Sequence, residues 1–377
     1  MWVEREFFYV IKFDKPYIAI EELQPQEGEK AKRLLLSFDL KPGENVQVKV
    51  GLSTVSIEGA QEALEKENPD WNFEKVKAQS AEAWNNLLSR IDVSGTEEQK
   101  VNFYTSIYHL CIQPNNITDV DGRYRGPNDS ILYSPIGEYY STLSLWDTYR
   151  AAHPLYTLLV PEKVNGFVNS MLSHCDTQGY LPIWALWGKE NHCMIGNHAI
   201  PVIVDAYLKG YKGFDPERAY EAIRKSSLES HPKSDWETYN QYGYYPFDLI
   251  PEESVSRTLE SCYDDYCVAQ MAKALGKKED YNFFSKRARA YTSLFDPVTK
   301  LMRGKDSQGK WREPFDPFRL SHAGTSGGDY TEGNAWQYVW HVQHDVDSLI
   351  EMMGGNKAFT AKLDSLFWLE NNTVNTG

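Results

Sequence analysis

The chain has 377 residues, 41% of them hydrophobic, and a formal net charge of −14 from 39 basic and 53 acidic side chains. This length suits two domains better than one, and the hydrophobic content can fill a core, which excludes a disordered chain. The acidic balance argues against nucleic acid or an anionic membrane as a partner, and no apolar run is long enough for a membrane span.

Strand patterns dominate the first 57 residues. Short apolar runs at 7–11 and 34–38, and alternating valines at 46–50, are typical of β-strands, with a Pro-Gly turn at 41–45 between the last two. These few strands need partners to close a sheet. We therefore expect the last part of an antiparallel β-sandwich domain whose beginning is absent. The charged start at Met1 shows no apolar leader, so the compartment stays open.

Helical periodicity begins near Ser56. Apolar positions between Phe73 and Ile91 recur at helical spacing and predict a linker helix. Asp215-Pro216 is a typical helix start, and the glycine of Leu275-Gly276 a typical helix end. Strand signals are nearly absent after residue 97. Helices are expected there at residues 97–113, 144–158, 162–175, 194–209, 216–228, 256–275, 279–294, 331–353 and 357–370.

Paired helices with long, aromatic-rich loops favour a helical toroid, in which the loops at one end form the substrate pocket. Eight to ten helices do not complete a double ring of twelve. The sequence thus predicts a mainly α protein with a small β part, divided into a β-sandwich remnant (1–60), a linker helix (61–96) and an incomplete (α/α)6 catalytic domain (97–377).

Aromatic side chains and thiols add two further hints. Eleven Trp, 24 Tyr and 16 Phe could stack on sugar rings or fill a large core, and composition does not separate these readings. The cysteines are odd in number and show no CxxC pair, which favours free thiols over a disulfide framework or zinc site. They are Cys111, Cys175, Cys193, Cys262 and Cys267.

Two polar and aromatic segments are candidates for sugar binding. Trp146 and Asp147 enter a helix together, where a carboxylate could bind hydroxyls while the indole stacks; alternatively, Asp147 caps the helix. Glu190 and Asn191 precede a glycine-containing helix start and could also contact hydroxyls. His198, a little further on, is more typical of a hydrogen-bonded structural histidine.

A third segment, residues 256–266, contains the adjacent carboxylates Asp264 and Asp265. Neighbours on a helix point in different directions, so at most one of them can face a site. In the alternative interpretation both are solvated, and Arg257 and Glu260 form a surface ion pair.

The fourth segment contains Glu332. The double glycine 327–328 leads into an expected helix whose first turn contains this glutamate, surrounded by Tyr330, Trp336 and Tyr338. Desolvation by aromatic rings raises a carboxyl pKa, as a general acid at neutral pH requires. Spacing equally allows a capping glutamate, three residues after Asp329 as the cap.

Other chemistries lack their motifs. The sequence has no P-loop, no GxSxG nucleophile turn and no HExxH zinc helix, and the pair His341 and His344 has no third histidine at metal spacing.

Read in order, the segments resemble glycoside hydrolase family 92, the calcium-dependent exo-α-mannosidases. The resemblance runs from about residue 45 to the end. The matching segments are Val55–Ala60, Phe103–His109 with Pro114 and Asp119–Tyr124, Ser144–Arg150 with His153–Leu155, Met194–Ala199 and Glu332–Tyr338.

This resemblance implies inverting hydrolysis of terminal α-linked mannose, often α-1,2-linked, in glycans such as N-glycans. Inversion needs one carboxylic acid at the leaving oxygen and another carboxylate that activates water on the opposite face. Glu332 matches the family's acid, and Trp146 and Asp147 its mannose-binding residues, with Glu190 and Asn191 as weaker candidates. It also implies Ca²⁺ bound through oxygen ligands, and relatives that are secreted or periplasmic.

The family's base aspartates and most calcium ligands lie downstream of the Glu332 motif, so we expect them beyond residue 377. The chain by itself is therefore expected to lack a general base and to be inactive alone. Two alternatives remain: another helical-toroid glycosidase, trehalase- or glucoamylase-like, and a non-catalytic carbohydrate-binding derivative.

Overall fold

The computed structural model describes residues 3–24, 28, 31–321 and 328–369, and it is mainly helical with small sheets. At the N-terminal end, β1 (Phe8–Phe13) pairs antiparallel with β4 (Val48–Ser53), and β2 (Ala19–Leu23) with β3 (Arg33–Ser37). The expected strands at 7–11, 34–38 and 46–50 are confirmed within a few residues. β2 was not predicted, because its side chains are almost all exposed.

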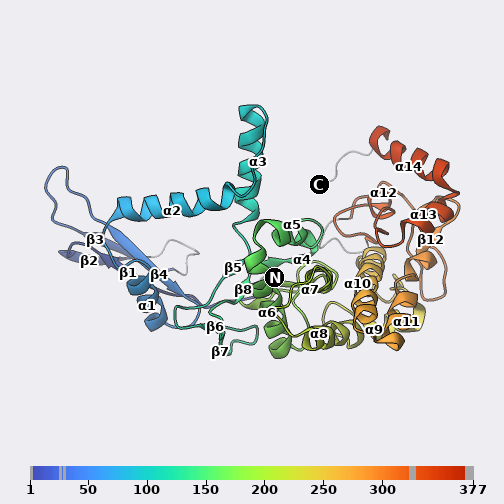
Figure 1. Cartoon of the computed structure of the whole chain (residues 1–377), viewed down its shortest axis with the longest axis horizontal. Helices are drawn as coiled ribbons and strands as arrows, with labels where there is room; N and C mark the ends of the chain where they lie inside the picture. The colour runs from blue at the N-terminus through green and yellow to red at the C-terminus, as the bar shows by residue number, and fades with distance from the viewer. Residues whose placement is uncertain (1–2, 25–27, 29–30, 322–327, 370–377) are drawn as a thin grey trace.

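Two helices then lead away from these strands. In α1 (Ile57–Glu67) the side chain of Ser56 caps the first turn, and Ala60 and Leu64 are buried near β4. The expected linker helix is α2 (Phe73–Leu88), whose residues are all at least partly exposed. Figure 1 shows it running from the strands toward α3 (Glu97–Leu110).

The remainder is a set of packed helices joined by loops. They are α4 (Leu145–Thr148), α5 (Ala152–Leu159), α6 (Pro161–Gln178), α7 (Ala199–Leu208), α8 (Pro216–Leu228), α9 (Trp236–Tyr242), α10 (Ser254–Ala274), α11 (Lys278–Arg287), the 3₁₀ turn η1 (Ala290–Leu294), α12 (Ala335–Tyr338), α13 (Val346–Met353) and α14 (Asn356–Trp368). Asp215 caps α8 and Pro216 opens it, as the sequence indicated.

Short strands lie in the loops of this helical part, contrary to the expectation of almost none. A two- or three-residue strand leaves no periodicity to read. They are β5 (Asn115–Asn116), β6 (Arg123–Arg125), β7 (Ile131–Tyr133), β8 (Tyr140–Ser141), β9 (Leu143–Ser144), β10 (Trp184–Leu186), β11 (Lys189–Glu190), β12 (Phe295–Asp296) and β13 (Leu301–Met302). β9, β10 and β11 form a three-stranded sheet.

Three expected helices are divided in the structure. Residues 279–294 form α11 and the 3₁₀ turn η1. Residues 144–158 form α4 and α5 with a break between them, and 331–353 form only α12 and α13, separated by turns. Neither of these two ranges is therefore a single continuous helix. Among the residues that the structure describes, no helix is both long and apolar enough to cross a membrane.

Helix α10 lies at the centre of the helical part (Figure 1). Its C-terminal half, including Val268 and Met271, belongs to a core shared with α6, α7 and α8. Its N-terminal half, including Val255 and Leu259, belongs to a second core with η1, β13, α12 and α13. This 21-residue helix therefore joins both halves of the helical part.

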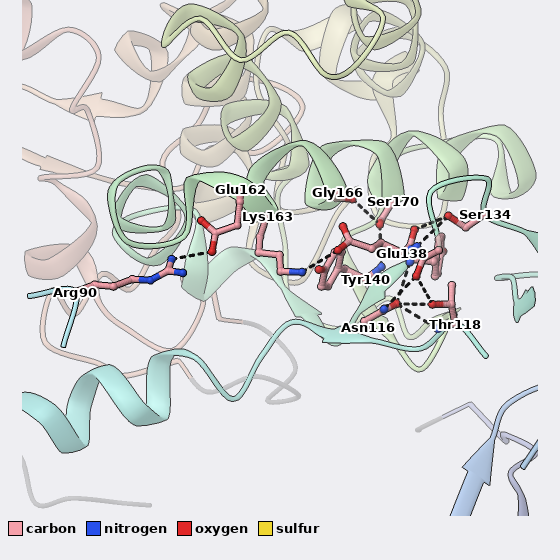
Figure 2. Close-up of polar contacts among 12 residues, drawn as sticks. Arg90, Asn116, Thr118, Ser134, Glu138, Tyr140, Glu162, Lys163, Gly166 and Ser170 are labelled. Carbon is pink, nitrogen blue, oxygen red and sulfur yellow. Dashed lines mark hydrogen bonds and ion pairs between the residues drawn. The ribbon is translucent and has the colours of Figure 1, made fainter. Parts of the chain in front are cut away.

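Ion pairs fix the start of α6 to the segments before it. Figure 2 shows Arg90, which follows α2, reaching Glu162, with Nη1 and Oε1 2.7 Å apart. The next residue, Lys163, reaches Glu138 in the loop before β8, with 2.8 Å between Nζ and Oε1. These side chains are partly exposed, so they position the loop more than they stabilise it.

Candidate active site

Glu332 is the exposed residue of an otherwise largely buried loop immediately before α12, and it does not lie in the first turn of that helix as the sequence suggested. The helix cap is Asn334, which forms a capping box with Gln337. Glu332 has a φ of 45°, in the left-handed region that a side chain rarely adopts. Its side chain is exposed, so the expected shielding by aromatic rings is wrong; Tyr330 and Tyr338 are buried in the core instead.

The loop that holds Glu332 is bound to the N-terminus of α10. The backbone N–H groups of Val255 and Ser256 donate to the carbonyl of Asp329, at 3.0 and 3.2 Å. The hydroxyl of Ser256 accepts from Thr331 N–H at 2.8 Å. Asp329 is therefore not a cap for Glu332; its carboxylate binds Arg312. Of the double glycine, Gly327 lies outside the described residues.

Trp146 and Asp147 lie in α4, which is a single turn. Asp147 is exposed and accepts a hydrogen bond from the hydroxyl of Ser144. The indole Nε1 of Trp146 points inward and donates to Oε1 of Glu260 over 3.0 Å. Asp147 is thus exposed, whereas Trp146 is half-buried with its indole N–H turned toward Glu260.

The carboxylates of Glu332 and Asp147 both influence the thiol of Cys193. Burial raises the pKa of the Cys193 thiol, the charge of Lys233 lowers it, and the carboxylates of Glu332 and Asp147 raise it further. Electrostatic influence on one thiol requires both carboxylates to lie near it. The two carboxylates, which are 185 positions apart in the chain, therefore lie within electrostatic range of the same thiol.

The loop around Cys193 is strained. His192 and Met194 have φ values of 52° and 63°, and Glu332 has a φ of 45°. Non-glycine residues in this region cost free energy and persist only where the surrounding structure holds them, which is common at functional sites. This strain is an independent reason to place a site here.

Glu190 and Asn191 are occupied by the protein itself. The buried carboxylate of Glu190 accepts hydrogen bonds from the backbone N–H groups of Ile183, Trp184 and His192, at 2.8, 3.0 and 2.8 Å. The side-chain oxygen of Asn191 accepts from Arg5 near the start of the chain. In this arrangement both residues shape the β10–β11 hairpin, and sugar binding by them stays a prediction.

Behind α4 lies a fully buried carboxylate, Glu260 on α10, that the sequence suggested would pair with Arg257 on the surface. That interpretation is wrong: Glu260 is 0% exposed, and Arg257 lies 3.7 Å from Glu253 instead. Glu260 is bound by residues from three other segments. Its partners are Trp146, Tyr149 and Arg150 around α4, His198 at the start of α7, and His341 after α12.

His198 is placed between two carboxylates. Its Nδ1 lies 2.9 Å from Asp264 and its Nε2 3.0 Å from Glu260. Burial alone would lower the pKa of His198, but the two carboxylates outweigh burial and raise the pKa to about 9. His198 is therefore an imidazolium at neutral pH. Gly196, with φ 81°, leaves room for the ring, because a Cβ there would lie 2.2 Å from Nε2.

His341 completes the cluster from the other side. Its Nε2 lies 2.8 Å from Glu260, and its Nδ1 lies 3.3 Å from Nη1 of Arg150. A guanidinium can only donate, so in a neutral His341 ring Nδ1 accepts from Arg150 and Nε2–H donates a hydrogen bond to Glu260. Burial alone would raise the pKa of Glu260, but the two imidazoles outweigh it and hold the pKa well below the usual range.

Of the adjacent aspartates, Asp264 faces this cluster and Asp265 faces away, bound by Arg287 with 2.7 Å to each carboxylate oxygen. Both are buried, so the solvated alternative is wrong. A cavity of about 360 Å³ borders the cluster; its lining residues are Tyr149, Arg150, Tyr263, Gln337, Trp340, His341 and Gln343.

No cluster of metal-ligating side chains for calcium is found among the described residues. Within the described ranges, no group of three or more His, Cys, Asp or Glu side chains is arranged to hold a metal ion. The expectation of calcium ligands beyond residue 377 stays a prediction, and no step below uses a metal.

Comparison with known proteins identifies a class of glycoside hydrolases. The family GH92 α-mannosidase BT3965 from Bacteroides thetaiotaomicron is 38% identical, with a TM-score of 0.90, over 98% of this chain and 51% of that one. Its complex with mannoimidazole gives a TM-score of 0.92 at 38% identity over 99% of this chain and 51% of that one. The family GH92 inverting mannosidase BT2199 from the same organism is 30% identical with a TM-score of 0.86, over 98% and 51%.

The pattern of the glycosyl hydrolase family 92 catalytic domain matches residues 59–377, so the chain belongs to that family. An uncharacterized secreted glycosidase from Arthroderma benhamiae is 28% identical over 85% of this chain and 42% of its own length. The chain thus spans about half the length of the solved relatives it matches.

Sequence reasoning missed the cluster around Glu260. The available signal was the spacing of Glu260 and Asp264, which at i and i+4 share one helix face. The spacing shows that they share a face but not whether that face is buried, because every partner of Glu260 is more than 60 positions away.

Proposed function

We propose that this chain forms the acid-bearing part of an exo-acting α-mannosidase that removes terminal α-linked mannose with inversion. The observation that carries the proposal is Glu332, whose exposed carboxylate lies on a loop anchored to α10 and, like the carboxylate of Asp147, within electrostatic range of Cys193. The family membership and the solved relatives, one of which binds mannoimidazole, support it. The inverting relative supports the stereochemistry, and the helical part is proposed to be a portion of an (α/α)6 toroid.

In this mechanism the terminal mannose binds at α4, with Trp146 and Asp147 as its contacts. The carboxyl group of Glu332 donates its proton to the glycosidic oxygen as the bond from that oxygen to the anomeric carbon breaks. Water attacks the opposite face of the sugar and loses a proton to a separate base. We assign that base to none of the described carboxylates. Calcium assistance is part of the family resemblance and remains a prediction.

The test replaces Glu332 with glutamine, which keeps the shape and removes the transferable proton. We expect hydrolysis of α-1,2-mannobiose, by the chain together with the downstream part that is expected to supply the base, to fall by about 10²- to 10⁴-fold. An aryl α-mannoside with an acidic phenol should lose less activity, because its leaving group needs less protonation. The exposed Glu351 on α13 supplies the control, since Glu351→Gln should change neither rate.

NMR of the first product should show β-mannose before mutarotation, as inversion requires. Faster hydrolysis of maltose or trehalose than of mannobiose would instead indicate the other helical-toroid glycosidases. Sugar binding with no turnover of any of the three, even when the chain is completed by the part expected to supply the base, would indicate a non-catalytic derivative.

A further inference from the structure

Glu260 is the point at which the segments carrying the candidate site meet. Trp146 donates to it across 3.0 Å and Arg150 across 3.1 Å, both from the α4 region that also carries Asp147. His198 contacts it from the end of the Cys193 loop at 3.0 Å. His341, nine positions after Glu332, contacts it at 2.8 Å.

These segments depend on contacts with the rest of the protein for their conformation. A single helical turn such as α4 gains too few hydrogen bonds to be stable by itself, so its position depends on side-chain contacts. The Cys193 loop contains two residues with positive φ, which persist only where the surroundings fix them. Glu260, by contrast, belongs to the long α10, which both cores hold in place.

The same helix supports the acid. Its first residues, Val255 and Ser256, bind the backbone of the loop before Glu332. One turn and a half further along, Glu260 binds α4. Helix α10 therefore contacts both the loop that carries Glu332, through its N-terminus, and the α4 region that carries Asp147, through Glu260.

We propose that Glu260 is a positioning residue, whose carboxylate sets the placement of Trp146 and Asp147 relative to Glu332. This inference rests on the proposed mannosidase function. Glu260 does not contact the sugar and transfers no proton to it. It acts by holding donors: the guanidinium of Arg150, the phenol of Tyr149 and the imidazoles of His198 and His341, with Asp264 as the second anion on His198.

The experiment is Glu260→Gln. An amide keeps the size but has one acceptor atom, and its NH₂ group meets donors that need an acceptor. We expect α4 to shift, so that KM for α-1,2-mannobiose rises about tenfold or more, with kcat falling as well, because small misplacements at a site cost large factors in rate. The affinity for mannoimidazole should fall in parallel.

The matched control is Asp265→Asn, five positions along the same helix. Asp265 is equally buried and equally bound by a cation, but its partner Arg287 faces away from the site. This variant should lose stability while KM and kcat per folded molecule stay within about twofold. A purely structural role for Glu260 predicts the same behaviour for both variants.

A second measurement is independent of turnover. Nitrogen chemical shifts should show His198 protonated on both ring atoms at pH 7.5 in the unaltered protein, and its titration midpoint should fall by about one pH unit or more in Glu260→Gln. If the glutamine variant does not fold, Arg150→Met tests the same tie from a partly exposed side chain, with a several-fold rise in KM expected.

The outcomes separate the two claims. If the unaltered chain, together with the downstream part that is expected to supply the base, turns over no α-mannoside, the proposed function fails, and the positioning role fails with it. If the unaltered protein is active but KM, kcat and mannoimidazole affinity are unchanged in Glu260→Gln, only the positioning role is overturned.

Discussion

Helix α10 carries buried carboxylates on two faces, and the two faces are connected very differently. On one, Glu260 and Asp264 are bound by residues from the α4, α7 and α12 regions, which also carry the candidate site. On the other, Asp265 binds Arg287 of α11, which also donates to the carbonyl of Ser227. Both faces bury charge, but only the first connects segments that meet at Glu332 and Asp147.

On the Asp265 face, both carboxylate oxygens are already bound within the protein. The guanidinium of Arg287 lies 2.7 Å from each carboxylate oxygen and packs 4.5 Å from the ring of Trp236. Every group there is compensated within the core of α8, α9 and α11, so the face adds to stability without touching the site. The comparison teaches that burial of a carboxylate does not reveal its role; the location of its partners does.

The largest expected effect on stability is at the Asp265 face. Asp265→Asn leaves the buried Arg287 without its anion, and breaking such a pair costs about 3–5 kcal/mol. Urea unfolding should report this loss. Replacing both partners, as Asp265→Leu with Arg287→Met, should recover most of it, because no uncompensated charge remains. A loss below about 1 kcal/mol in the single variant would show that the ion pair between Asp265 and Arg287 stabilises the protein no more than a surface ion pair does.

The Glu260 face should show a pH dependence of stability above about pH 6.5. The pKa of His198 is raised to about 9 in the folded protein, above the value of about 6.5 in an unfolded chain. Its stabilising contribution is therefore complete below about pH 6.5 and is lost as pH rises through about 9, with a limit of about 3 kcal/mol.

The measurement is the free energy of unfolding at pH 6, 7.5 and 9 for the unaltered protein and for His198→Gln. The variant is expected to be less stable throughout, but its stability should fall less between pH 6 and 9. Only the difference in slope bears on His198, because other groups titrate equally in both proteins. Parallel slopes would contradict the placement of an imidazolium between Glu260 and Asp264.

The sequence predicted those parts of the fold that local chemistry determines. The start of α8 follows from Asp215 and Pro216, since a carboxylate cap and a fixed φ act within one turn. The family motifs selected Glu332 and Asp147, which the structure brings near one thiol. The roles of both residues remain predictions.

What could not be predicted depends on distant partners. The loop position of Glu332 follows from the anchoring of Thr331 to Ser256 and of Gly333 to Ser321. Glu260 read as a surface residue because its neighbour in sequence, Arg257, offers a plausible ion pair. Its actual partners, such as His198 and His341, are far away in the chain, and no spacing rule relates them.

The smallest effect, and the finest test of the comparison, is expected from Tyr149→Phe. The phenol of Tyr149 lies 3.3 Å from Glu260, the longest of the contacts to that carboxylate, and its ring stacks on His198 at 4.0 Å. Burial raises the pKa of the phenol, so it stays protonated and donates. Phenylalanine keeps the stacking and removes only this donor. Since the other donors to Glu260 lie at 2.8 to 3.1 Å, the loss should be about 1 kcal/mol or less, with KM within about twofold. A tenfold rise in KM would show that the hydroxyl, and not the charged partners, holds α4, and the distinction between the two faces of α10 would then rest on one neutral hydrogen bond.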